Sequence, residues 1–317
     1  MVRVVTIIIL FSFVTGSIIV GGLSFRSSQN LKTPSTTPAT DNADDEIGRW
    51  QEAVKLNPQD PFALRNLARA EMRAGKFPEA KKALEEAVKY SPKDPLTYEL
   101  LGQLSLAMGK GADGVAQFQK ALALKPGDVM LTYELALAYS LFGDPASALT
   151  YYRQVVQKTP RSKEGLNARF AMVGIYKEQG NFKNAEKEAL NLEASFPNNP
   201  QIISTLVDIY EKEKDWRKAI FNAEKLRKLE PSDTTLAIRL AGFYEKSGDW
   251  MEAQKIWADL ISKSPQNPDY KYQMAVTDKK TGKNAEAKDL LERAQQEATE
   301  EKNKTLIQKI EAEVKGL

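Results

Sequence analysis

Apolar residues recur at helical spacings along most of this chain. Leu96, Leu100, Leu104 and Met108 follow one another at intervals of one helical turn, which predicts an amphipathic helix. The next six residues, GKGADG at 109–114, fit the glycine pattern of a phosphate-binding loop. That loop requires a strand before it, so a preceding helix argues against nucleotide binding. The pattern instead predicts a turn between two helices.

An internal repeat organises the chain after Asp45. Seven prolines mark the repeat, and the differences between their positions are 34, 34, 34, 37, 34 and 34: Pro58, Pro92, Pro126, Pro160, Pro197, Pro231 and Pro265. Internal repeats of this length are typical of stacked helix pairs. The three extra residues lie between Pro160 and Met172. We expect them to lengthen or kink the junction of the third and fourth repeats and to divide the stack there.

The second repeat carries a series of residues at characteristic positions: Tyr98, Leu101, Gly102, Gly114, Phe118, Ala121 and Pro126. This series resembles the tetratricopeptide repeat family, whose pattern is W-x2-L-G-x2-Y, then A-x3-F, A and P. The resemblance covers residues 46–298. It implies an all-α fold, a right-handed superhelical solenoid of about seven antiparallel helix pairs. We expect residues 299–317 to form a helix that caps the solenoid, with a partner-binding helix as the alternative. Glu71, Ser105 and Asp278 depart from the pattern at its tyrosine.

The composition narrows the possible chemistry. The 317 residues include no cysteine and no histidine, which excludes disulfides, thiolate or imidazole metal ligands and the Ser-His-Asp triad. The 45 basic and 42 acidic residues give a net charge of +3, so no strong field favours nucleic acid. Acidic residues scattered among lysines are typical of solvated helix faces. We therefore expect no enzyme, no cofactor, no metal and no small-molecule substrate.

The N-terminal segment differs from the repeats. Residues 4–25 carry no charge, and as one helix this run would span roughly 33 Å, enough to cross a hydrocarbon core of about 30 Å. We expect residues 1–25 to be a single transmembrane anchor, with a cleaved signal peptide as the alternative. Residues 26–45 are rich in Ser, Thr and Pro, which predicts a disordered linker. A basic residue before the apolar run favours export, which would place the repeats in the periplasm; a cytoplasmic-facing or secreted protein is the alternative.

The family resemblance implies that the first helix of each repeat lines a concave groove, which usually binds a peptide or helix of a partner. The first repeat directs a row of arginines into that groove: Arg65, Arg69 and Arg73. They suit the carboxylates of a partner, or equally are solvated and paired with neighbouring acidic residues. The following repeats add six apolar side chains: Leu96, Leu106, Met130, Tyr133, Leu137 and Phe170. These suit an apolar helix or an extended hydrophobic segment, unless some of them contact the neighbouring repeat.

These features together predict a membrane-tethered scaffold that binds a protein or peptide partner in its concave groove. The expected setting is the assembly, secretion or biogenesis of an envelope or membrane complex. One alternative is a secreted peptide-binding protein released by signal cleavage. A non-catalytic subunit of an enzyme complex is a further alternative.

Overall fold

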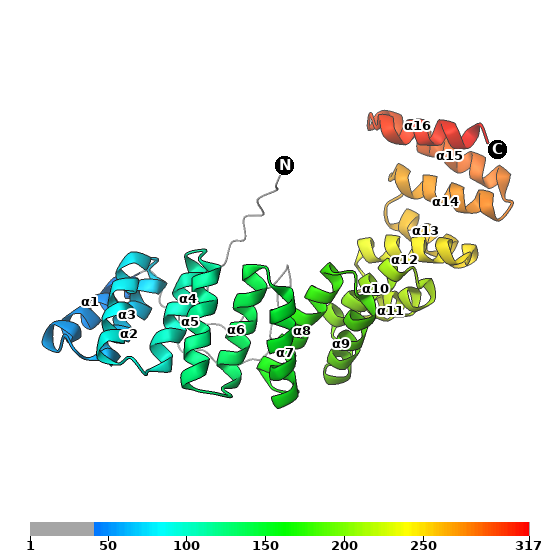
Figure 1. The fold of residues 1–317 in the computed structure, drawn as a ribbon. Coiled ribbons are helices and arrows are strands. Elements are labelled where there is room, and N and C mark those ends of the chain that lie inside the picture. The colour runs from blue at the N-terminus through cyan, green and yellow to red at the C-terminus, as the bar shows by residue number, and fades with distance from the viewer. Residues whose placement is uncertain (1–40, 317) are drawn as a thin grey trace. The chain divides into compact units, whose positions relative to one another are not determined.

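The computed structural model describes residues 41–316, and within this range it contains sixteen α-helices and no strand (Figure 1). The helices are α1 Asp41–Leu56, α2 Pro61–Arg73, α3 Phe77–Tyr90, α4 Pro95–Ala107, α5 Gly111–Leu124, α6 Val129–Phe142, α7 Pro145–Lys158, α8 Lys163–Glu178, α9 Phe182–Ser195, α10 Pro200–Glu213, α11 Trp216–Leu229, α12 Thr234–Ser247, α13 Trp250–Lys263, α14 Pro268–Lys280, α15 Asn284–Glu300 and α16 Lys304–Val314. The all-α class predicted from the sequence is confirmed.

The glycine-rich segment 109–114 connects the two helices of one repeat. Helix α4 ends at Ala107, α5 begins at Gly111, and Gly109 between them has a φ of 73°. This left-handed conformation carries little steric cost for glycine because glycine has no Cβ. The prediction of a turn between two helices, rather than a phosphate-binding loop, is confirmed.

An aspartate caps the N-terminus of the first helix in each of the first three repeats. The side chains of Asp60, Asp94 and Asp128 accept hydrogen bonds from backbone N–H groups in the first turns of α2, α4 and α6. Such an N-cap stabilises a helix by about 1 kcal/mol. Successive aspartates stand one full repeat apart in the sequence, so the three helices start in the same register. Residues that follow them at equal distances therefore occupy equivalent places in successive repeats.

The chain divides into two compact units, one ending at Gln179 and the other beginning at Gly180. Unit 1 holds α1 to α8, and unit 2 holds α9 to α16. The boundary lies inside the fourth repeat, whereas we expected a division at the three-residue insertion after Pro160. The insertion instead adds a turn to the start of α8, which has 16 residues where α4 has 13 and α6 has 14. Position 165 in this turn has no room for a side chain, because a Cβ there would lie 1.8 Å from the carbonyl oxygen of Thr159.

In unit 1 each first helix packs against the second helix of its repeat, α2 on α3, α4 on α5 and α6 on α7. Small residues allow these helices to approach closely. Ala80 and Ala148 are fully buried, and a Cβ at Gly102 would lie 2.8 Å from the ring of Phe118. The small residues of the sequence pattern are thus placed where the helices of a pair meet.

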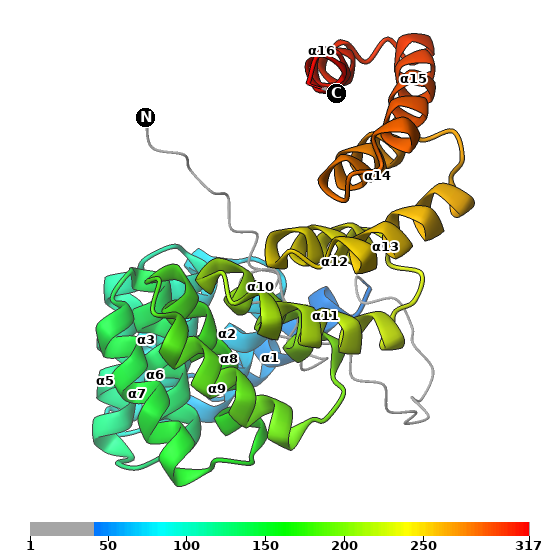
Figure 2. The ribbon, with the colours of Figure 1, turned by 90° about the vertical axis from the view of Figure 1, so that its right-hand side faces the viewer.

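Unit 2 has the same pairing, α10 with α11, α12 with α13 and α14 with α15, which can be followed in Figure 2. The last helix, α16, packs on α14 and α15, and its Leu306 and Ile310 are buried in that contact. Most of the segment 299–317 therefore lies against the final helix pair, while its first two residues belong to α15, which ends at Glu300.

The expectations for the N-terminal segment lie largely outside the described residues. The predicted anchor, 1–25, and most of the predicted linker, 26–45, are not among them. The last five residues of that linker are helical, because α1 already begins at Asp41. This early start is tied to the first repeat by an ion pair between Asp44 and Lys76, with 2.9 Å between Oδ1 and Nζ. Within residues 41–316, every helix is too short or too polar to cross a bilayer.

Candidate protein-binding groove

The first helices of unit 1 form its more closely spaced layer. Helix α2 contacts α4, α4 contacts α6 and α6 contacts α8, whereas the second helices α3, α5 and α7 make no comparable contacts with one another. In a curved stack of helix pairs, the layer with the closer spacing lies on the inside of the curve. The concave side of unit 1 is therefore formed by α2, α4, α6 and α8.

Three large apolar side chains stand in a row on this side of unit 1. Phe62, Leu96 and Met130 are each the second residue of a first helix, and they are 58%, 48% and 45% exposed. The opposite face of each helix packs on its second helix, so the exposed row faces the groove. The ring centre of Trp50 in α1 lies 5.8 Å from that of Phe62, in an edge-to-face contact. We call Phe62, Leu96 and Met130 the apolar stripe.

Two of the residues predicted to face the groove belong to the core instead. Leu106 is buried and packs against Phe118 of α5, and Tyr133 is buried with its ring centre 5.7 Å from that of a tyrosine in α7. The prediction that both offer their side chains to a partner is wrong, because each contacts the second helix of its own repeat. Two further predicted groove residues, Leu137 on α6 and Phe170 on α8, are half-buried.

The row of arginines is largely engaged within the fold. Arg65 forms an ion pair with Asp94, the residue that caps α4, and both side chains are mostly buried. Arg73 forms an ion pair with Glu46 of α1, with 2.8 Å between Nη2 and Oε1. Arg69 donates a hydrogen bond of 3.2 Å to a side-chain amide one turn away on α2. The idea that three parallel guanidiniums grip a partner's carboxylates is corrected, because two of them already neutralise carboxylates of this chain.

The groove side of α4 and α6 also carries the carboxylates of Glu99 and Glu134. Neither was among the residues predicted from the sequence to face the groove. Burial and the charge of Glu99 raise the pKa of Glu134, hydrogen bonding from Gln103 opposes the shift, and the resulting pKa is about 7. Burial also raises the pKa of Glu99, against the charge of Arg69. A signal for Glu99 was present, because it stands one full repeat after Arg65 and so occupies the equivalent place in the second repeat.

The first helices of unit 2 carry a different surface. Arg239 of α12 donates to Asp208 Oδ1 at 2.9 Å and to Glu211 Oε2 at 2.6 Å, both on α10. Lys279 of α14 pairs with Glu313 of α16 at 2.9 Å. The second residues of α10, α12 and α14 are glutamine, threonine and aspartate, so they form no apolar row. The charges of Arg239 and Lys279 are thus neutralised by carboxylates of neighbouring helices.

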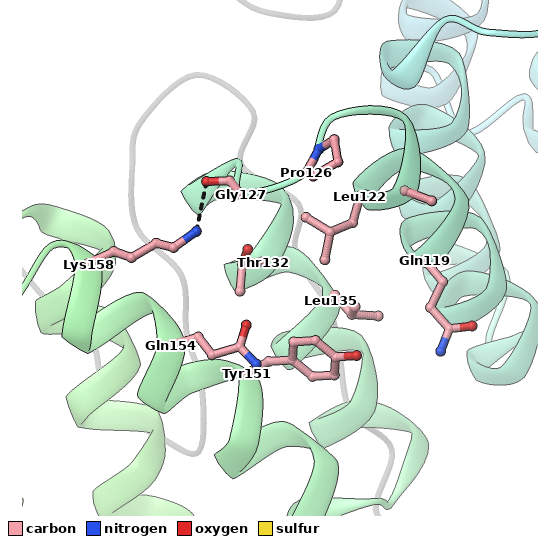
Figure 3. Close-up of a pocket in the computed structure, with 10 residues that line it drawn as sticks. Gln119, Leu122, Pro126, Gly127, Thr132, Leu135, Tyr151, Gln154 and Lys158 are labelled. Atoms are coloured by element: carbon pink, nitrogen blue, oxygen red, sulfur yellow. Dashed lines mark hydrogen bonds between the residues drawn. The ribbon is translucent and has the colours of Figure 1, made fainter.

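A pocket of about 370 Å³ lies on the second-helix side of unit 1, between α5 and α7 (Figure 3). The ring of Tyr151 lines it and stacks on Tyr139, with ring centres 5.6 Å apart. Lys158, the one charged residue in its lining, donates a hydrogen bond of 3.2 Å to the carbonyl oxygen of Gly127. Its leucines, Leu122 and Leu135, are half-buried and buried, and its cation is held by the protein's own backbone. The groove is therefore the better candidate site.

Comparison with family models agrees with the helix pairs described above. Two models, each described as tetratricopeptide repeat, match residues 49–104 and 210–275 and residues 99–163. The chain belongs to the tetratricopeptide repeat family. The matched segments cover more than half of the chain and include the whole apolar stripe. The glutamate at position 71 is thus a substitution within a matched tetratricopeptide segment. No curated protein matches the chain.

Solved tetratricopeptide structures share this fold at low sequence identity. The C-terminal part of a TPR repeat-containing protein from Cytophaga hutchinsonii is similar with a TM-score of 0.62 and 15% identity, over 73% of this chain and 93% of that chain. YrrB, a TPR protein with an unusual peptide-binding site, has a TM-score of 0.50 and 18% identity, over 61% of this chain and 97% of that chain. A chain of the Naa15/Naa10 structure bound to HypK-THB has a TM-score of 0.53 and 18% identity, over 74% of this chain and 36% of that chain. Identities this low show the fold alone.

Proposed function

We propose that this tetratricopeptide protein is a scaffold that binds a segment of a partner protein in the groove of unit 1. The observation that carries the proposal is the apolar stripe, in which Phe62, Leu96 and Met130 are exposed in equal register on the concave side. An exposed row of large apolar side chains is typical of a protein-binding surface. The similarity in fold to YrrB, a protein with a peptide-binding site, supports a peptide segment as the occupant.

The apolar stripe can supply a substantial part of the binding free energy. Complete burial of a large apolar side chain is worth about 1.5–3 kcal/mol, so covering the exposed half of three such side chains is worth about 3 kcal/mol. This corresponds to about a hundredfold in affinity. Nothing in this estimate requires the fold to change, because each of the three side chains projects from the first turn of a helix that is already capped.

Site-specific photo-crosslinking in cells tests the proposal. A p-benzoylphenylalanine residue placed at Leu96, in the stripe, is expected to give discrete adducts with a partner protein. Leu124 is a matched control, because it is an exposed leucine at the end of the second helix α5. Adducts from Leu124 with none from Leu96 would place the binding surface on the opposite side and contradict the proposal.

We also propose that residues 4–25 anchor the scaffold in a membrane with the repeats on the extracytoplasmic side. The support is the long uncharged run and the polar linker after it. Tethering would raise the effective concentration of the groove at the membrane, up to the millimolar range for short linkers. Such a scaffold suits the assembly, secretion or biogenesis of an envelope complex. The second candidate is a secreted peptide-binding protein, produced if the same run is cleaved.

Protease protection in sealed membrane vesicles distinguishes these candidates when it is combined with mass spectrometry of the mature N-terminus. Intact residues 4–25, with repeats digested only from the extracytoplasmic face, are the expected result. A new N-terminus within residues 15–25 would favour the secreted protein. Digestion of the repeats only from the cytoplasmic face would contradict the proposed topology.

A further inference from the structure

Hydrogen-bond acceptors are concentrated on the groove side of α4 and α6. The Oε1 atom of Gln103 is buried and accepts no hydrogen bond from the part of the chain that the structure describes. The amide of the same residue donates to Glu99 Oε1 at 3.5 Å. Glu134 is the neighbour of both residues on α6, since each of them influences its ionisation. This acceptor cluster, Glu99, Gln103 and Glu134, therefore has more acceptor oxygens than donors to satisfy them.

The carboxylates of the acceptor cluster form no close ion pair in the part of unit 1 that the structure describes, although the charges of Arg69 and Lys125 act on Glu99. Two other carboxylates on this side have close cations: Asp94 pairs with Arg65, and Asp128 pairs with Lys125 at 2.6 Å. Glu134 has no ion pair within residues 41–316. Like charges on neighbouring helices repel each other, and burial disfavours their ionised forms. A cation supplied from outside would offset both penalties for the carboxylates.

The acceptor cluster lies close to the apolar stripe. Met130 and Glu134 are one turn apart on α6, which places their Cα atoms about 6 Å apart along the helix axis. In an extended peptide, residues i and i+2 point to the same side and are about 6.6 Å apart. An extended segment can therefore place one apolar side chain on the stripe and a second side chain, two residues away, at the acceptor cluster.

We propose that the segment bound in the groove is extended and carries a lysine or arginine two residues from an apolar side chain. The apolar side chain packs on Leu96 and Met130, and the cation pairs with Glu99 and Glu134. This inference rests on the proposed function, because it assumes that the groove of unit 1 binds a protein segment. It identifies the partner by its chemistry: an apolar residue and a basic residue at alternate positions.

Selection from a peptide mixture tests the inference. The probe is a set of acetylated and amidated decapeptides with one fixed leucine and all other positions randomised without cysteine. The mixture is passed over the immobilised full-length protein, and the retained peptides are sequenced by mass spectrometry. We expect lysine and arginine to be enriched about tenfold over glutamine at two residues from the leucine. Glu134→Gln should abolish this enrichment, while Glu230→Gln, at an exposed glutamate of unit 2, should leave it unchanged.

The possible outcomes separate the inference from the proposed function. Retention that falls in Met130→Ser but shows no preference for lysine or arginine overturns the inference and leaves the groove as the binding site. Retention that is the same in Met130→Ser, or no retention of any peptide, overturns the proposed function together with the inference. A dimer in sedimentation that dissociates in Met130→Ser would make a second copy of the chain the occupant, and this also overturns the inference.

Discussion

Glu71 offers the sharpest test of how the sequence of one repeat determines its stability. It occupies the place of the family's tyrosine in the first repeat, it is only 5% exposed, and its Oε2 atom is buried without a hydrogen-bond partner in the described part of the chain. Burial and the charge of Glu79 raise its pKa, the charge of Lys76 opposes the shift, and the resulting pKa is about 7. We expect Glu71→Gln to stabilise the first repeat above neutral pH.

The sign and size of this effect follow from linkage between protonation and folding. The folded-state pKa of Glu71 is about 7 and the reference value is 4.5, so the folded state binds more protons between these values. Stability is therefore greatest at low pH and is lost as pH rises through this window. Between pH 5 and pH 8 the loss from this one carboxyl is about 2.5 kcal/mol. Glutamine does not titrate, so the free energy of unfolding of the variant does not fall in this way between pH 5 and pH 8.

Hydrogen exchange measured by mass spectrometry can follow α2 and α3 alone, after correction for the intrinsic exchange rate at each pH. Protection of these helices in the wild type, relative to Glu71→Gln, should fall about 70-fold between pH 5 and pH 8. The glutamine side chain of the variant has its own burial cost, but this cost does not change with pH. It therefore cancels when the protection at pH 5 is compared with that at pH 8. Glu85→Gln, at an exposed glutamate of α3, is the control and should show no such change. An equal pH response in wild type and Glu71→Gln would mean that Glu71 does not titrate with a raised pKa in the folded protein.

Three further predictions concern packing, a buried ion pair and binding. Gly102→Ala should destabilise unit 1 by about 1–3 kcal/mol in thermal unfolding, because its Cβ would meet a phenylalanine ring of α5 at 2.8 Å. Gly174→Ala, with nothing within 4 Å, should instead stabilise by about 0.5–1 kcal/mol. Lys271→Met leaves the buried partner Glu297 unpaired and should lower the stability of unit 2 by about 3 kcal/mol, whereas adding Glu297→Leu should recover most of the loss. Binding of a leucine- and lysine-containing peptide, followed by fluorescence polarisation, should strengthen about tenfold from pH 6 to pH 8, because Glu134 must lose its proton; Glu134→Gln should remove this dependence.

The sequence was sufficient to predict the repeat and its turns. Regularly spaced prolines, a small residue at each helix crossing and a glycine such as Gly109 at the turn are local requirements of a helix pair. They depend little on distant contacts, so the helices and the family followed from them. The place of the division was not predictable in this way, because the inserted residues were absorbed by a longer α8.

The groove was predicted less well, because helical periodicity shows which residues share a face but not how much of that face is covered. Each first helix touches its own second helix and its neighbours, so the buried part is wide enough to include Leu106 and Tyr133. The partner of Arg65 is Asp94, which also caps the next first helix. Whether a charged residue finds a partner depends on how two repeats meet, which the sequence does not show. The pairing of Arg65 and the lack of an ion pair at Glu134 within residues 41–316 were therefore both unpredictable.

The affinity of the partner segment for the apolar stripe shows whether the groove of unit 1 is the binding surface. The segment identified by crosslinking would be synthesised, and its dissociation constant measured for the wild-type protein, Met130→Ser and Leu124→Ser. Met130 and Leu124 are both exposed at the surface, so neither change should disturb the core. We expect about fivefold weaker binding for Met130→Ser and unchanged binding for Leu124→Ser. Unchanged binding for Met130→Ser, with loss for Leu124→Ser, would contradict binding in the groove.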